Sequence, residues 1–404
     1  MRSIVISLLA FLAFSECYSQ NDFAQWRGPD RNGIYPEKNL LDRWPDVGPQ
    51  LLWKYDNLGR GYSSPAVTGT KIWTIGMIDS ISYIFNFDHQ GKLLWKKPLE
   101  TDYTGDYPGT YSTPTICDDL GYVVNGLGVL YCFDAGTGNI RWKIDMMKEF
   151  KGQPGPSGFL DNLLVDGEKL YCTPGGAGRH VVALNRRSGD VIWSSAGESV
   201  VDTYCSPILI EKGGKRLFIY ITSKSLIALD SNNGIEMWKV GINGRALPQT
   251  PVYRDGFILF SDYRNGSFKL KVSEDGQSIQ EVWKTRNMIL QMGEAIVLGD
   301  RVYARGKQEK FYCVDWNTGQ ELYSEPAKGM VTTLISAEGL LYCYDMEGNF
   351  SLRKPVENRL ETVGSFTVLG GTKDHCSHPV IKDGKLYIRH DNSLFVYNIA
   401  KELK

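Results

Sequence analysis

The feature that most constrains this chain is a hairpin pattern that recurs along it. Within residues 131–142, a short run of β-forming residues leads into the turn Asp134-Ala-Gly-Thr-Gly138, and a second run ends at Trp142. An Asp or Asn side chain at the start of such a turn bonds backbone amides ahead of it, and Gly takes up positive φ. The pattern therefore predicts two antiparallel strands joined by a tight turn. It returns at residues 87–95, 184–193, 229–238 and 314–323.

The spacing of the copies predicts the architecture. Each copy closes a unit that begins with an apolar pair, usually after Ser-Pro or Thr-Pro, and contains two further strands, so a unit has four strands. Four strands at a period of about 40 to 50 residues are typical of β-propeller blades. The closing aromatic residues are 40 to 51 positions apart: Trp53, Trp95, Trp142, Trp193, Trp238, Trp283 and Tyr323.

The two ends of the chain complete each other in this scheme. The eighth unit begins near Ser377 and ends without a closing Trp strand, whereas residues 49–55 resemble a closing strand that no unit precedes. Pairing the two would leave no open sheet edge between the first and last blades. We therefore predict an all-β protein, an eight-bladed β-propeller with four-stranded blades, whose ring is closed by an N-terminal strand that joins the last blade.

The first twenty residues have the pattern of an export signal. Arg2 precedes an apolar run over residues 4–14, which is too short to span a bilayer, and polar residues follow. We expect a signal peptide at 1–20, an N-terminal extension at 21–48 and the propeller at 49–404. A lipidated Cys17 is the alternative, although Glu16 stands where that processing prefers a small residue. The mature protein is expected in the periplasm or outside the cell, as a monomer without a membrane span.

Charge and cysteine content narrow the partners further. The chain has 45 Lys and Arg against 46 Asp and Glu, with no basic block, which argues against nucleic acid as a partner. Seven cysteines remain after Cys17, an odd number that excludes complete disulfide pairing. Four of them occupy matching strand positions in separate units, so we expect buried thiols at Cys132, Cys172, Cys313 and Cys343.

The repeat pattern, with Asp, Gly and Trp at these spacings, resembles the pyrrolo-quinoline quinone (PQQ) repeat of the quinoprotein alcohol dehydrogenase-like propellers. The resemblance covers residues 49–401, and Trp26-Arg-Gly-Pro29 is similar to the opening of secreted members of this group. It implies eight blades. For function it implies several roles, because the same propeller serves quinone-dependent dehydrogenases and a scaffold lipoprotein of outer-membrane protein assembly.

The loops that lead into the first strand of each blade should gather at one mouth of the channel, and they are rich in Tyr, Arg, Asp and His. Tyrosines there could stack on a planar or sugar-like ligand, and arginines could meet carboxylates. Packing of the loops against one another is the alternative. The candidate ligand-binding residues are Arg60, Tyr62, Tyr111, Tyr204, Arg245, His375 and His378.

The segment Asp374-His-Cys-Ser-His378 holds the densest set of chemically active side chains. His375, Cys376 and His378 are ligand types that soft metals prefer. Adjacent residues on a strand point to opposite faces, so at most two of the three would converge. We therefore expect no metal site.

Three functions remain open from sequence. The first is an exported propeller that binds a small-molecule ligand or an envelope protein at its mouth, with no catalytic role assigned. The second is a PQQ-dependent alcohol or sugar dehydrogenase, with Asp202 or Asp374 as general base. Relatives of that kind carry adjacent, disulfide-bonded cysteines beside the quinone and a bound Ca²⁺, and this chain has no adjacent cysteines. The cofactor is therefore left unassigned. The third function is a scaffold for outer-membrane protein assembly.

Overall fold

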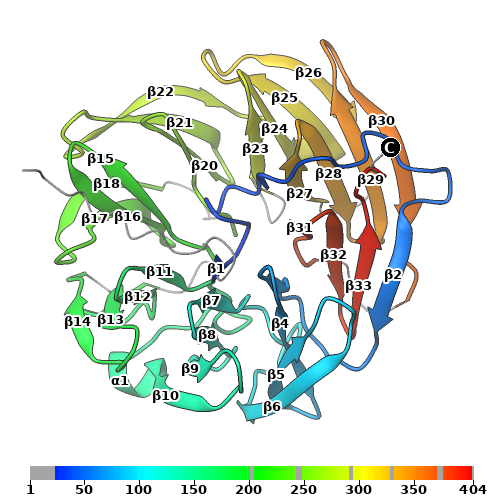
Figure 1. The fold of residues 1–404 in the computed structure, drawn as a ribbon. Helices are drawn as coiled ribbons and strands as arrows, with labels where there is room; N and C mark the ends of the chain where they lie inside the picture. The colour runs from blue at the N-terminus through cyan, green and yellow to red at the C-terminus, as the bar shows by residue number, and fades with distance from the viewer. Residues whose placement is uncertain are drawn as a thin grey trace, which may run out of the picture.

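Short β-forming runs separated by Gly and Asp turns fold into eight four-stranded blades arranged in a ring (Figure 1). The computed structural model describes residues 23–197, 199–200, 204–242, 248–290, 294–327, 332–370 and 376–402. Neighbouring strands of each blade pair antiparallel, and in chain order they run from the channel outward. The prediction of an all-β, eight-bladed propeller is confirmed.

The first four blades follow the chain in sequence. Blade 1 contains β3 (Ala66–Val67), β4 (Ile72–Ile78), β5 (Ile81–Phe87) and β6 (Leu93–Thr101). Blade 2 contains β7 (Thr115–Cys117), β8 (Leu120–Val124), β9 (Val129–Asp134) and β10 (Ile140–Asp145). Blade 3 contains β11 (Leu164–Asp166), β12 (Lys169–Cys172), β13 (Val182–Asn185) and β14 (Val191–Ser194). Blade 4 contains β15 (Ile208–Lys212), β16 (Lys215–Ile221), β17 (Ser225–Asp230) and β18 (Glu236–Gly241).

The remaining blades complete the ring. Blade 5 contains β19 (Val252–Arg254), β20 (Phe257–Asp262), β21 (Gly266–Val272) and β22 (Ile279–Thr285). Blade 6 contains β23 (Ala295–Leu298), β24 (Arg301–Gly306), the 3-10 turn η1 (Lys307–Glu309), β25 (Lys310–Asp315) and β26 (Glu321–Pro326). Blade 7 contains β27 (Thr332–Ala337), β28 (Leu340–Asp345), β29 (Asn349–Pro355) and β30 (Leu360–Thr367). Blade 8 contains β31 (Val380–Lys382), β32 (Lys385–His390), β33 (Ser393–Asn398) and β2 (Gln50–Tyr55).

The outer strand of blade 8 comes from the opposite end of the chain. Strand β2 pairs antiparallel with β33, from Gln50 opposite Asn398 to Tyr55 opposite Leu394. The strand at residues 49–55 thus occupies the position of the missing closing strand. How strongly the ring depends on it stays a prediction.

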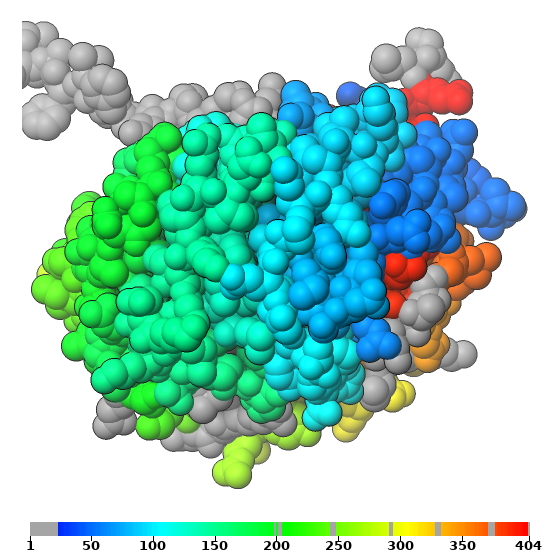
Figure 2. All heavy atoms as spheres, turned by 90° about the horizontal axis from the view of Figure 1, so that it is seen from below, coloured from blue at the N-terminus to red at the C-terminus, as the bar shows by residue number. Residues whose placement is uncertain are grey.

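The ring has two faces, and Figure 2 shows it from the rim. Loops that lead into the first strands, and loops between second and third strands, lie on one face, which we call the mouth face. Loops between first and second strands, and between third and fourth strands, lie on the other, which we call the turn face. Among the described residues no helix is long and apolar enough to cross a membrane.

The segment before β2 packs against the blades. Strand β1 (Phe23–Ala24) pairs with β7 and adds a fifth strand at the inner edge of blade 2. The chain then runs from the centre of the ring across blades 6 and 7 to the rim (Figure 1), and Tyr35 N–H donates to the Ser336 carbonyl at 2.8 Å. Near the rim, the Trp44 ring packs edge-on against Phe366 with ring centroids 5.3 Å apart. The extension expected at residues 21–48 is therefore in close contact with the propeller over its described part.

One short helix lies outside the repeat pattern. Helix α1 (Met146–Phe150) follows β10, and the Asp145 side chain caps it by accepting from Lys148 N–H at 3.1 Å. The sequence predicts no helices because a single helical turn leaves no periodic apolar stripe. Its buried residues Met146 and Phe150 instead pack with the core between blades 2 and 3.

The closing Trp of one blade docks on the hairpin turn of the next. Trp142 Nε1 donates to the Arg186 carbonyl at 3.2 Å, and Trp193 Nε1 donates to the Ser231 carbonyl at 3.0 Å. Trp53 of β2 makes the same bond across the chain ends, to the His89 carbonyl at 3.0 Å. The aromatic residue of the repeat therefore joins neighbouring blades.

The turn glycine is required for two reasons. Gly234 has φ of +73°, and a Cβ atom there would lie 2.4 Å from the Trp193 ring. The turn thus needs both the left-handed backbone and the missing side chain. The Asp at the start of the turn acts as predicted, because Thr137 N–H donates to Asp134 Oδ1 at 2.9 Å. The same close approach to an indole recurs at Gly91, Gly138, Gly189 and Gly319.

We expect Trp142→Ala to lower the free energy of unfolding by about 3 kcal/mol, at the low end for aromatic truncation because Trp142 is half-buried. Trp142→Phe keeps a ring over Gly189 but loses the bond to the Arg186 carbonyl, so it should cost only about 1 kcal/mol. Urea denaturation measures both. An alanine variant as stable as the phenylalanine variant would contradict docking.

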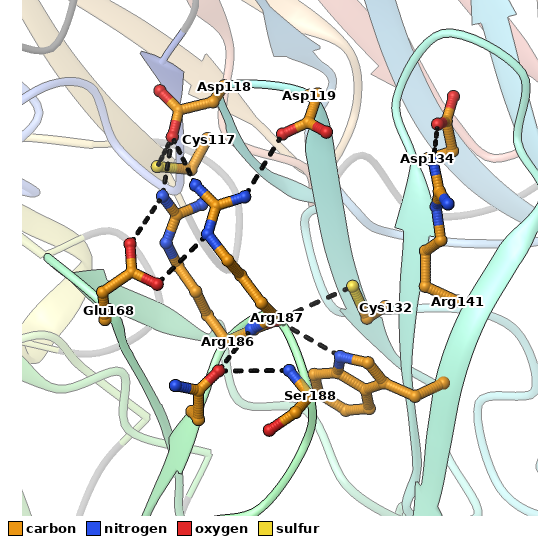
Figure 3. Close-up of polar contacts among 12 residues, drawn as sticks. Cys117, Asp118, Asp119, Cys132, Asp134, Arg141, Glu168, Arg186, Arg187 and Ser188 are labelled. Carbon is orange, nitrogen blue, oxygen red and sulfur yellow. Dashed lines mark hydrogen bonds and ion pairs between the residues drawn. The ribbon is translucent and has the colours of Figure 1, made fainter.

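An ion-pair cluster joins blades 2 and 3 on the turn face (Figure 3). Arg186, only 2% exposed, contacts Asp118 at 2.7 Å and Glu168 at 3.3 Å. Arg187 lies beside it and contacts Glu168 at 3.1 Å. Because Asp118 is 41% exposed, water screens this cluster and its contribution to stability is modest.

The four cysteines expected to be buried are buried. Cys132, Cys172, Cys313 and Cys343 are at most 3% exposed and carry free thiols. Burial is the largest cause that raises the pKa of each of these thiols, to about 12 for Cys132 and about 11 for Cys343. They serve as small apolar core residues.

Candidate functional site

The channel is lined near the mouth face by a ring of buried polar side chains. Each precedes the first strand of a different blade and is at most 5% exposed. Hydrogen bonds link neighbouring members of this ring. Thr113 N–H donates to Asn162 Oδ1 at 2.7 Å, and Asn162 Nδ2 donates to Ser206 Oγ at 2.9 Å. We call this set the polar ring: Ser64, Thr113, Asn162, Ser206, Thr250, Glu294 and His378.

The N-terminal segment fills the middle of the polar ring. Residues 25–35, called the plug from here on, carry two arginines into it. Arg27 Nε lies 2.9 Å from Glu294 Oε2, and its Nη1 lies 3.2 Å from His378 Nδ1. Arg27 also donates to the carbonyls of Leu334 at 3.2 Å and Asn32 at 3.0 Å. One guanidinium thus connects the plug to blades 6, 7 and 8.

The second arginine holds the plug to the other side of the channel. Arg31 donates to the Leu163 carbonyl at 3.0 Å and the Asn162 carbonyl at 2.9 Å, both in blade 3. Trp26 of the plug contacts two further members of the polar ring. Its ring centroid lies 4.5 Å from that of His378, and its Nε1 donates to Thr250 Oγ1 at 3.1 Å. The plug therefore bonds to five blades on opposite sides of the axis.

Burial dominates the electrostatics of this centre. It raises the pKa of Glu294, against the opposing effect of Arg27. It also lowers the pKa of Arg31 to about 9, although Glu294 and Asp161 act in the other direction. Charges taken this far from water are stable only with partners, so plug and ring depend on each other.

Tyrosines gather on the mouth face of the channel. The rings of Tyr62 and Tyr111 stack with centroids 4.8 Å apart at 27°. Tyr111 donates its hydroxyl to the carbonyl of Tyr107 at 2.7 Å, and the Tyr204 hydroxyl accepts from Ser157 N–H at 2.7 Å. Burial raises the pKa of Tyr111, and Tyr62, Cys376 and Tyr204 are close enough to raise it further. We call Tyr62, Tyr107, Tyr111 and Tyr204 the mouth tyrosines.

The structure brings some of the predicted site residues together and separates others. Tyr62, Tyr111 and Tyr204 share the mouth. Arg60 is exposed and lines a separate hollow of about 580 Å³ with Asp79 and Asp391. His378 is buried in the polar ring against Arg27. Asp202, Arg245, Asp374 and His375 lie outside the described residues.

The sequence missed the residues at the centre of the site. Arg27, Arg31 and Glu294 come from positions up to 267 residues apart along the chain, and only the ring closure brings them together. One signal was present: Ser or Thr precedes Pro at the start of four units, at Ser64, Thr113, Ser206 and Thr250. From sequence alone this pattern predicts only the start of a strand.

A second, larger hollow of about 710 Å³ opens on the turn face around the plug. Two ion pairs lie on its wall: Arg216 contacts Asp166 at 2.8 Å, and Lys382 contacts Glu37 at 3.6 Å. Within the described part of the chain, no group of three or more His, Cys, Asp or Glu side chains is placed to hold a metal ion.

The mouth tyrosines leave no slot for a planar quinone between Tyr62 and Tyr111, because these two rings stack on each other. The two buried cations of the plug, Arg27 and Arg31, bond to carbonyls, and Arg27 also pairs with Glu294. These bonds do not direct the guanidinium group of Arg27 or of Arg31 toward the mouth tyrosines.

Comparison with known proteins places the chain among propellers. The family model PQQ_2, described as outer membrane protein assembly factor BamB, matches residues 81–294 and 286–359. The crystal structure of BamB from Moraxella catarrhalis is similar with a TM-score of 0.62 and 15% identity, over 88% of this chain and 98% of that one. No curated protein matches.

Quinohemoprotein alcohol dehydrogenases are similar in fold as well. The enzyme from Comamonas testosteroni has a TM-score of 0.69 and 12% identity, over 96% of this chain and 82% of that one. The enzyme ADHIIG from Pseudomonas putida HK5 has a TM-score of 0.66 and 13% identity, over 95% of this chain and 81% of that one. At these identities the similarities establish the fold alone.

Proposed function

The chain belongs to the PQQ_2 family, whose model is described as outer membrane protein assembly factor BamB, and on this premise we propose that it is an exported propeller that binds other proteins at its mouth face. Its role in this proposal is that of a scaffold in outer-membrane protein assembly. The proposal includes removal of residues 1–20, a mature chain with an extension to residue 48 and a propeller from residue 49, and action as a periplasmic monomer.

The observation that carries the proposal is the filled channel. Sites for small molecules are usually concave and bury most of the ligand. Here the centre of the ring is occupied by Arg27 and Arg31, at most 3% exposed, and by Trp26. A channel centre filled by protein side chains favours a macromolecular partner on the mouth face over a small molecule bound within the ring.

The mouth tyrosines supply suitable contacts on that surface. Tyrosine is enriched at the energetic centres of protein interfaces because it combines a large apolar ring with a hydroxyl. Tyr107 is 62% exposed, and its backbone carbonyl is held by the Tyr111 hydroxyl. An exposed ring on a fixed backbone loses little conformational freedom when a partner binds.

Deletion of the gene in the native host tests the proposal. We expect the amounts of folded β-barrel proteins in the outer membrane, measured by heat-modifiable migration on gels, to fall and to return with the wild-type gene. Tyr107→Asn, which tolerates the positive φ of 54° at this position, should restore them by less than about half.

Tyr263→Asn is the matched control, because Tyr263 is 53% exposed on the mouth face but lies in blade 5, away from the mouth tyrosines. It should restore the amounts fully. Unchanged outer-membrane proteins in the deletion strain would overturn the scaffold proposal.

Calorimetric titration of PQQ into the mature protein, with and without Ca²⁺, tests the dehydrogenase alternative directly. We expect no heat of binding. Saturable binding, together with dye-linked oxidation of alcohols or sugars, would overturn the proposed function in favour of a quinone-dependent enzyme and make Asp202 and Asp374 the first residues to mutate.

A further inference from the structure

The outer strand of every blade is the edge of a sheet. Such an edge presents unpaired backbone N–H and C=O groups, and proteins commonly protect it with charged side chains, above all Lys. Seven of the eight outer strands in this chain contain a charged residue. The protecting residues are Lys54 in β2, Lys96 in β6, Lys143 in β10, Lys239 in β18, Lys284 in β22, Glu325 in β26 and Glu361 in β30.

The outer strand of blade 3 is the exception. Strand β14 reads Val191-Ile-Trp-Ser194 and has no charged residue. Five of the other strands place Lys directly after the docking Trp, where β14 has Ser194. The preceding Asp190 lies in the turn, where its carboxylate accepts from Ser188 Oγ at 2.6 Å. The charged side chain that protects the other outer strands is therefore missing from β14, which has only its short length and its bulge as protection.

Strand β14 carries two exposed aliphatic side chains, as β2 does with Leu51 and Leu52. Val191 is 46% exposed and Ile192 is 45% exposed. The ladder with β13 pairs Val191 with Leu184 and Trp193 with Ala183, so Ile192 is the extra residue of a β-bulge. Trp193 is docked on blade 4, and Ile235, next to the Gly234 that contacts its ring, is 61% exposed.

We propose that β14 is a docking edge to which a partner protein adds an extended segment as a further antiparallel or parallel strand. In the described residues β14 ends its sheet and pairs only with β13, as its place at the rim in Figure 1 shows. Backbone bonds to the edge would supply affinity, and the exposed Val191 and Ile192 would favour uncharged segments that carry aliphatic residues. This inference rests on the proposed function, since it names the chemistry of the partner.

A second copy of this chain is the less suitable occupant. Strand β14 has four residues, so two copies paired edge to edge would share a very short ladder. A stable interface buries roughly 1,200 Å² or more of total surface, which such a ladder cannot provide between two rigid discs. An extended segment can instead follow the rim toward Ile235 and increase the buried area.

A labelled model peptide tests the inference. The probe is a blocked peptide of about nine residues with alternating Val and Thr, and its fluorescence anisotropy is followed during titration with the full mature protein. We expect saturable binding and slower amide hydrogen exchange within residues 190–195. Ser194→Lys places a charge where five other blades have one and should weaken binding about tenfold.

Ser324→Lys is the matched control. Ser324 directly follows Tyr323 in β26, the position of Ser194 in β14, and that edge already carries Glu321 and Glu325. It should leave binding unchanged, and thermal unfolding should show that both variants are folded. Equal binding by wild type and Ser194→Lys, protection at another edge, or no binding at about 1 mM protein would each overturn the inference.

The inference and the proposed function fail in different ways. Suppose that the Ser194→Lys variant no longer binds the peptide and yet restores the amounts of outer-membrane proteins in the deletion strain. In that case β14 is not the functional docking edge, and the scaffold role stands. Concentration-dependent dimers that Ser194→Lys abolishes, seen by sedimentation, would assign the edge to a second copy and overturn the partner named here.

Discussion

Removal of residues 21–55 is expected to abolish the single cooperative unfolding transition of the protein. The deletion takes away β2, so blade 8 is left with three strands and β33 becomes an open edge. It also removes Trp53, whose Nε1 donates to the His89 carbonyl in the turn of blade 1 and whose ring lies against Gly91. Two of the links between the last blade and the first are lost, while others remain, such as the contact of His89 Nδ1 with the Tyr387 hydroxyl at 2.9 Å. The open edge of β33 favours aggregation.

Differential scanning calorimetry measures this effect. The wild-type protein should give one transition, and the truncated chain should give a broad or absent transition with soluble aggregates. Removal of residues 21–36 alone is the control, because it deletes the plug and leaves β2 in place. That variant should unfold at lower temperature but still in one transition. A truncated chain with unchanged melting behaviour would show that the ring does not need its N-terminal strand.

Arg27→Ala is expected to lower the free energy of unfolding by about 3 to 5 kcal/mol, because it leaves the carboxylate of Glu294 buried without its cation. Arg186→Ala is the matched control. Arg186 is equally buried at 2% exposure, but its partner Asp118 is 41% exposed and regains water when the pair is broken. That substitution should cost about 2 kcal/mol or less. Urea denaturation at neutral pH compares the two.

The pH dependence of Arg27→Ala follows from the raised pKa of Glu294. A carboxyl group whose pKa is raised by folding stabilises the folded state fully below its unfolded pKa, and this contribution is lost as pH rises through the folded pKa. Without Arg27 the largest effect that lowers the pKa of Glu294 is lost, and only Thr250 and Arg31 still oppose the desolvation, so the folded pKa rises further. The difference from wild type should therefore shrink at acidic pH. Equal destabilisation by Arg27→Ala and Arg186→Ala at all pH values would contradict the role given to the buried pair.

A double variant separates the buried charge from the packing of the plug. Arg27→Met with Glu294→Gln removes both charges and keeps an acceptor for Thr250 N–H, which donates to Glu294 Oε1 at 2.9 Å, so it should recover most of the stability that Arg27→Ala loses. Recovery would show that the cost lies in the uncompensated carboxylate. A double variant no more stable than Arg27→Ala would assign the cost to the carbonyls of Leu334 and Asn32 that lose their donor.

The mouth shows where sequence reasoning succeeded and where it stopped. Loops at the same position in every blade must meet at one face, so Tyr62, Tyr111 and Tyr204 could be grouped before their contacts were known. The repeat pattern does not predict how deep in the channel a side chain lies. His378 was expected beside these tyrosines, but it lies in the polar ring against Arg27. Depth depends on what fills the channel, and the filling comes from a segment outside the repeats.

The blades can be predicted from the repeat residues alone. The Asp and Gly of each turn and the Trp of each closing strand act within one hairpin or between adjacent ones, and local rules apply at such distances. The residues at the centre cannot be predicted in this way. The contact of Arg27 with Glu294 spans 267 positions and exists because eight blades close around a short polar segment, whose charges become stable only when the finished ring supplies their partners.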